Sequence, residues 1–143
     1  MLRNQTAWTT RTAPATAFQS IGTRGRRGQS STSDMTLNGI QLMALVQLEG
    51  VGCWDTRKPY NPSNVHIVER DPVKLGFVND LKLDVERENV WIVSNNLPIY
   101  LYSRLDYSQI NFRLLRANVQ QAIKNTVCDP RLPAIKTPLN TCT

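Results

Sequence analysis

Three short apolar runs follow one another between residues 89 and 116. In each run, apolar side chains occupy every second position, and this alternating set is Val90, Ile92, Ile99, Leu101, Phe112 and Leu114. Alternation among aromatic and β-branched neighbours is typical of β-strands. Polar breaks at residues 95–98 and 106–108 separate the runs, so we predict an antiparallel meander of three strands. Both faces of the meander are apolar, and we expect other layers to cover both.

A second apolar segment occupies residues 40–46 and resumes at residues 50–55 after a short break. Its length and composition favour a buried hairpin of two strands. The competing interpretation is a helix over residues 37–48, because several of its apolar residues also have helical spacing.

Shorter patterns complete the predicted elements. We expect strands at residues 65–68 and 81–85, the second of them paired through a tight turn with the strand that begins at Val90. This turn contains no glycine, so Asn89 is the residue that we expect to adopt a positive φ. The only predicted helix covers residues 118–124. The pattern as a whole indicates an all-β protein with a short C-terminal helix.

Charge is distributed unevenly along the 143 residues. The net charge of +6 suggests nucleic-acid binding, but residues 1–27 contain five arginines and no acidic residue, whereas the remainder is almost neutral. A basic arm without an RNA- or DNA-binding pattern does not define a nucleic-acid interface. No apolar run reaches the roughly 18 residues that a membrane span needs. We therefore expect neither nucleic acid nor membrane as a partner.

Few residues of this chain suit catalysis or metal binding. His66 is the only histidine and lies in an alternating strand pattern, while Cys53, Cys128 and Cys142 lack the spacing of metal ligands. Phosphate-loop and dinucleotide-binding patterns are absent. The carboxylates occur singly or in one solvated turn. We predict no catalytic residue, no metal site and no cofactor.

Several motifs in register carry a family resemblance. Residues 91–119 read WIVSNNLPIYLYSRLDYSQINFRLLRANV, and AIKNTVCD follows at residues 122–129. Upstream segments are GCWDT with PYNPSN between residues 52 and 64, and the weaker LRNQT and GQSS near the N-terminus. Together these segments are similar to the C-terminal part of the yellow / major royal jelly protein family.

The resemblance implies a fold and a domain organisation. Members of this family are six-bladed β-propellers, and at about 40–50 residues per blade this chain supplies two to three blades. Residues 1–34 would be a flexible basic arm or part of a blade, residues 35–130 the blades, and residues 131–143 an extended tail with prolines. The missing N-terminal blades of the same fold would be the natural partners.

The resemblance also implies an extracellular protein. Family members are secreted, although Met1 is not followed by a recognisable signal peptide. Cys53 and Cys128 lie in family-like segments, so the resemblance implies that they form a disulfide. Asn4 begins a glycosylation sequon, which is usable only on a secreted chain.

A ligand site is implied at the end of the strand that contains Trp91. There Ser94 and Asn95 would face the propeller channel, with Trp91 and Val93 packed between blades. An amide can donate to and accept from a small aromatic amine or indole-like ligand; the alternative role of Asn95 is to cap a turn. Family members bind biogenic amines or serve structural and nutritive roles, which is the function expected here; the alternative is dopachrome conversion in insect melanin formation.

Overall fold

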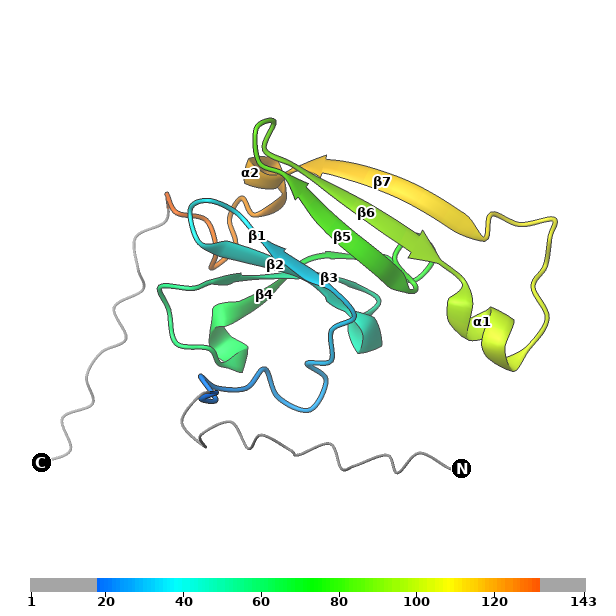
Figure 1. Ribbon diagram of the computed structural model, residues 1–143, viewed down its shortest axis with the longest axis horizontal. Helices are drawn as coiled ribbons and strands as arrows, with labels where there is room; N and C mark the ends of the chain where they lie inside the picture. The colour runs from blue at the N-terminus through cyan, green and yellow to red at the C-terminus, as the bar shows by residue number, and fades with distance from the viewer. Residues whose placement is uncertain (1–17, 132–143) are drawn as a thin grey trace, which may run out of the picture.

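The computed structural model describes residues 18–131, which form two antiparallel β-sheets. The first sheet has the order β1-β2-β3-β4, with bounds Ser33–Met35, Ile40–Leu45, Gly50–Asp55 and Val65–Arg70. The second has the order β5-β6-β7, with bounds Val78–Asp84, Asn89–Asn95 and Phe112–Asn118. Two short α-helices are present, α1 (Leu97–Tyr102) and α2 (Val119–Ala122), with 3-10 turns at Val46–Leu48 and Pro62–Asn64. Figure 1 shows the two sheets stacked on each other.

The all-β prediction is confirmed, and the two successive sheets are those of a partial β-propeller that is not closed into a ring. The structure describes nothing of residues 1–17 and 132–143, so the predicted arm and tail lie largely outside it. Within the described residues, no helix is long and apolar enough to cross a membrane.

The hairpin of β2 and β3 forms the centre of the first sheet. Its register pairs Ile40 with Asp55 and Leu45 with Gly50, which confirms strands rather than a helix in this segment. Every residue of β3 is buried. A side chain at Gly50 would place its Cβ 2.3 Å from the Glu69 carbonyl oxygen, so only glycine permits the close approach of β3 and β4.

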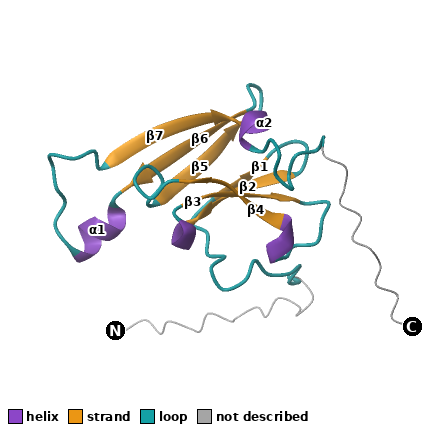
Figure 2. Cartoon of the chain, turned by 180° about the vertical axis from the view of Figure 1, so that it is seen from behind, coloured by secondary structure: helices purple, strands orange, loops and turns teal. Residues whose placement is uncertain are grey.

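The prediction of a middle strand in the meander is wrong. Residues 97–102 form helix α1, and β6 pairs directly with β7, from Asn95 opposite Phe112 to Asn89 opposite Asn118. Pro98 lies in the first turn of α1, where proline is favoured because its missing N–H has no helical partner. Since α1 buries none of its residues, no packing against the sheets selects a strand over a helix. Helix α1 and the loop that leads to β7 form an excursion from the sheets, and it stands away from both of them in Figure 1 and, from behind, in Figure 2.

The turn between β5 and β6 differs in one residue from the prediction. Glu88, rather than Asn89, has a positive φ of 51°. Asn89 already pairs with Asp84 and with Asn118 as the first residue of β6. The pairing with both neighbouring strands requires an extended backbone at Asn89. The left-handed conformation is therefore found one residue earlier, at Glu88.

The core lies between the sheets, and their first strands bring them together. It is formed by Ile40, Leu42, Ala44, Val51, Cys53, Leu75, Val78, Leu81, Val90, Ile92, Val119, Ile123 and Cys128. Near β1, the Ser31 hydroxyl donates to the Val78 carbonyl at 2.6 Å, and the Leu83 amide donates to the Asp34 carboxylate at 3.0 Å. Only one face of the second sheet is covered in this way, whereas the sequence predicted cover on both.

Candidate functional site

The predicted ligand residues lie at the C-terminal end of β6. Ser94 is 1% exposed and shares the buried face of β6 with Val90 and Ile92. Asn95 is half-buried on the opposite face, with Trp91 and Val93. Because successive side chains of a strand point to opposite faces, the two side chains do not meet on one surface. The expected orientation is therefore wrong for Ser94, which points into the core; binding by either residue stays a prediction.

Asn95 also organises the chain that follows it. Its Oδ1 accepts a hydrogen bond from the Leu97 amide at 3.0 Å, and this turn begins α1. Beside it, the Asn96 amide group donates to Asn111 Oδ1 at 2.9 Å, and Asn111 donates to the Asp106 carbonyl at 2.8 Å. These three asparagines close the base of the excursion formed by residues 97–111. The turn-capping role that the sequence left open for Asn95 is thus present.

Aromatic side chains gather on the same face as Asn95. Phe112 is the residue directly opposite Asn95 in the β6–β7 pairing and is 61% exposed. Trp91 is 37% exposed, and the Arg116 guanidinium lies 5.6 Å from the centre of its ring. Directly opposed side chains have Cβ atoms about 4.5–5.5 Å apart, so one ligand can contact both Asn95 and Phe112. The sequence treated Phe112 as an ordinary strand residue, because only the register reveals this pairing.

A hollow of about 790 Å³ opens between the two sheets on the side of β4 and β7. Its apolar walls include Leu42, Val51, Val68, Val90, Ile92 and Leu115. Its rim is polar, with Glu69, Asp71, Lys74, Asn118 and Gln121. Asp71 is already engaged with Lys74 at 3.4 Å and with the amides of residues 73 and 74. No sequence pattern predicted this hollow, and Asn95 is not among its lining residues.

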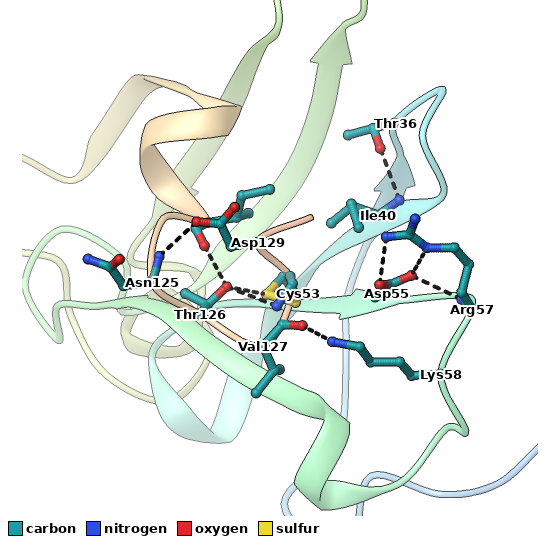
Figure 3. The surroundings of a disulfide bond; sticks show 12 residues. Thr36, Ile40, Cys53, Asp55, Arg57, Lys58, Asn125, Thr126, Val127 and Asp129 are labelled. Atoms are coloured by element: carbon teal, nitrogen blue, oxygen red, sulfur yellow. Dashed lines mark hydrogen bonds and ion pairs between the residues drawn. A yellow bond between two sulfur atoms is a disulfide. The ribbon is translucent and has the colours of Figure 1, made fainter. Parts of the chain in front are cut away.

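A disulfide between Cys53 and Cys128 joins β3 to the segment that follows α2 (Figure 3). Their Cα atoms are 6.3 Å apart, and both cysteines are fully buried. Thr126 lies against the bond: its hydroxyl is 3.6 Å from Cys53 Sγ and accepts from the Cys128 amide at 3.1 Å. Lys58 adds a hydrogen bond to the Val127 carbonyl. The bond and these contacts fix the segment that follows α2 on the first sheet.

Two similar ion pairs flank the disulfide. The Arg57 guanidinium donates two 2.8 Å hydrogen bonds to Asp55, and Arg131 makes the same fork to Asp129 at 2.8 and 2.9 Å. Both carboxylates are buried, while the arginines reach solvent. The hydrogen bonds from Arg57 lower the pKa of Asp55 below its ordinary value, and those from Arg131 lower the pKa of Asp129. Each pair therefore favours the ionised carboxylate in the folded state.

The remaining predicted site residue, Asn4, lies outside the described residues, as does Cys142. Glycosylation at Asn4 stays a prediction.

Comparison with known proteins identifies the family. The family model described as "Major royal jelly protein" matches residues 1–128. The chain is 47% identical over 135 residues to Dopaminechrome tautomerase of Drosophila melanogaster, covering 91% of this chain and 29% of that protein. It is 42% identical over 114 residues to Protein yellow of Drosophila pseudoobscura pseudoobscura, covering 80% of this chain and 20% of that protein. The chain belongs to the major royal jelly protein family, and the resemblance seen in the sequence is confirmed.

The chain spans less than a third of the length of these relatives. It corresponds to part of their fold, in agreement with two sheets that do not close a ring.

The disulfide generates a prediction about stability. In the chain-entropy model, closing a loop of 75 residues stabilises the folded chain by about 3 to 5 kcal/mol. We expect Cys128→Ser to lower the free energy of unfolding by that order in a urea titration. Cys142→Ser is the matched control and should change it little. Equal effects of the two substitutions would show that the Cys53–Cys128 bond does not carry the stabilisation.

The Asp55–Arg57 pair generates a prediction about pH. Because the folded-state pKa of Asp55 is depressed, its contribution is complete above the unfolded pKa and is lost as the pH falls below about 4. We expect Asp55→Asn to destabilise the chain at neutral pH, with a difference from the parent that shrinks on acidification. Glu86→Gln, in the exposed β5–β6 turn, should show no such trend. A difference for Asp55→Asn that is independent of pH would contradict the assignment.

Proposed function

We propose that the chain is part of an extracellular propeller of the major royal jelly protein family that binds a small aromatic amine or indole-like ligand. The observation that carries this proposal is the pairing of Asn95 with the exposed ring of Phe112 at the end of β6. An amide can hydrogen-bond an amine or hydroxyl group, and an exposed ring can stack on an aromatic one. The two side chains together match both halves of such a ligand.

The extracellular location is supported by the buried disulfide and by the family. Disulfides persist in oxidising compartments and are rare in the cytosol. The Cys53–Cys128 bond ties together segments that are 75 residues apart in the sequence, so it would be a structural rather than a transient bond. Members of the family are generally secreted.

Binding by these residues alone should be weak. A hydrogen bond contributes about 0.5–1.5 kcal/mol net, and an aromatic pair adds about as much. A complete propeller would add contacts from parts of the fold that this chain does not span. A structural or nutritive role remains compatible with weak binding, because such a role requires no tight ligand.

A second candidate function is tautomerisation of an aminochrome. The 47% identity to Dopaminechrome tautomerase favours it. A tautomerase moves a proton between two positions of its substrate and needs a positioned acid or base. Asn95 and Phe112 could hold the substrate, while the proton-transferring group would come from elsewhere in the full-length fold. The two candidates thus share a binding site and differ in whether turnover follows.

Titration of the chain with dopamine and with tryptamine, monitored by NMR chemical-shift changes, tests the binding proposal. We expect Asn95→Ala and Phe112→Ala each to weaken binding several-fold. Because α1 buries no residue, the melting temperature should stay nearly unchanged in Asn95→Ala. Asn79→Ala, an exposed asparagine on β5, is the matched control.

The outcomes separate the two candidates. In the full-length protein that contains the rest of the fold, dopaminechrome turnover that is lost in Asn95→Ala while binding persists would favour the tautomerase. Unchanged binding and turnover in both variants would contradict the proposed site and leave Asn95 with a turn-capping role only.

A further inference from the structure

A loop with three arginines precedes β1 and lies against the first sheet. Residues 24–27 read RGRR, and Gly28 follows. In Figure 1 the loop runs along the side of the first sheet that faces away from the second sheet. Arg26 and Arg27 are exposed and lie in a turn that is closed by a 3.1 Å hydrogen bond from the Gly28 amide to the Gly25 carbonyl. Neither arginine forms an ion pair with another residue in the described part of the chain.

The chain is attached to the first sheet on both sides of this turn. Before the turn, the Thr23 amide donates to the Tyr60 carbonyl at 3.2 Å, and the Arg24 guanidinium lies 5.8 Å from the centre of the Tyr60 ring. After the turn, the Val46 amide donates to the Gln29 carbonyl at 3.2 Å. The turn therefore connects two anchored points, and none of its residues belongs to the core.

The three arginines match the substrate chemistry of one class of protease. A serine endoprotease whose cleft is lined with carboxylates binds arginine at the first, second and fourth positions before the bond that it cuts, because guanidinium groups pair strongly with carboxylates. If the bond after Arg27 is cut, Arg27, Arg26 and Arg24 occupy these positions. Exposed loop tips with small or polar residues are also the preferred sites of proteolytic nicking. The loop thus combines the charges and the access that such a protease requires.

The second pair of adjacent basic residues lacks both conditions. Arg57 is bound to Asp55, and Lys58 donates to the Val127 carbonyl. Pro59 follows Lys58. Because proline has a fixed φ and no N–H, the bond before it is a poor substrate. This pair serves the fold rather than a protease.

Arg113 and Arg116 have the spacing of the first and fourth positions, but they lie in a strand. The backbone of β7 pairs with β6 along its whole length. A protease binds its substrate as a free extended segment, so β7 would first have to leave the sheet. Among the described residues, the loop at residues 24–28 is the place where this sequence pattern is accessible.

We propose that the bond between Arg27 and Gly28 is a processing site for a serine endoprotease with a carboxylate-lined cleft. Water is the second substrate. The C–N bond between the two residues breaks, the Arg27 carbonyl carbon gains the oxygen of water and becomes a carboxylate, and the Gly28 nitrogen gains a proton and becomes an N-terminal amine. Binding requires only that Arg24 leaves Tyr60 and that the Gly25–Gly28 hydrogen bond opens, which is a local change at the surface.

The cut would separate the preceding segment from the two sheets. All strands of the described chain and all three cysteines follow Gly28. No disulfide can therefore hold the preceding segment, which keeps only noncovalent contacts such as those with Tyr60. The sheets should remain folded after the cut. The proposal is independent of the ligand site, which lies on the second sheet, and a test with a purified protease is also independent of the extracellular location.

The probe is a purified soluble protease of the furin type, added with calcium to the intact folded chain. We expect one cut, followed by release of a fragment that begins with Gly-Gln-Ser-Ser in N-terminal sequencing. The fragment should still unfold cooperatively in a thermal melt, because the core residues all lie after the cut.

Substitutions test the recognition of the arginines. Arg27→Gln removes the charge beside the cut bond and should slow cleavage at least about a hundredfold, because carboxylates of the protease would be left unpaired. Arg26→Lys keeps the charge and should be cut about as fast as the parent chain. Arg87→Gln, which changes an exposed arginine in the β5–β6 turn, is the matched control and should leave the rate unchanged.

Several results would overturn the proposal. These are a chain that stays uncut, a cut after Lys58 or Arg116 that is as fast as the cut after Arg27, or cleavage of the loop that Arg27→Gln does not slow. An uncut chain that binds heparin at physiological salt, and loses this binding in Arg27→Gln, would assign the loop to an anionic glycan instead.

Discussion

The disulfide between Cys53 and Cys128 is the constraint on which the rest of the structure depends. It connects the central strand of the first sheet with the segment that follows the last strand of the second. The two sheets share one core, and residues of both, together with the two cysteines, belong to it. The chain between the bonded residues contains β4 to β7, so the bond closes most of the described fold into one loop. An unclosed pair of propeller sheets has no ring to hold it together, and this bond supplies part of that restraint.

The strands were largely predictable from the sequence, whereas the exposed helix at residues 97–102 was not. The hairpin of β2 and β3 has continuous apolar residues and is buried almost throughout. The pair of β5 and β6 has alternating apolar residues that bury one face. Residues 97–102 have a similar apolar composition but bury nothing. In that case local factors decide the conformation: a proline in the first turn and the hydrogen bond from the Leu97 amide to the Asn95 side chain. Composition alone cannot distinguish an apolar run that packs against a sheet from one that does not.

The candidate site shows the same limit. The sequence predicted ligand residues at the end of β6 and placed Ser94 and Asn95 on one surface. Alternation along a strand prevents this, and Asn95 instead meets Phe112 from the neighbouring strand. That pairing joins residues 17 positions apart in the sequence. It depends on the register of β6 with β7, which pair directly although α1 and its loop lie between them in the sequence. The hollow beside β7 likewise arises from how two sheets diverge, a property that no single segment encodes.

The way the two sheets are held together depends most directly on which cysteines are bonded. Mass spectrometry of proteolytic peptides from the unreduced chain, expressed through a eukaryotic secretory pathway, measures this connectivity. We expect one linked pair of peptides that contains Cys53 and Cys128, with Cys142 outside the bond. A bond from Cys142 to either residue, or Cys53 and Cys128 recovered as free thiols, would contradict the account of how the two sheets are held together.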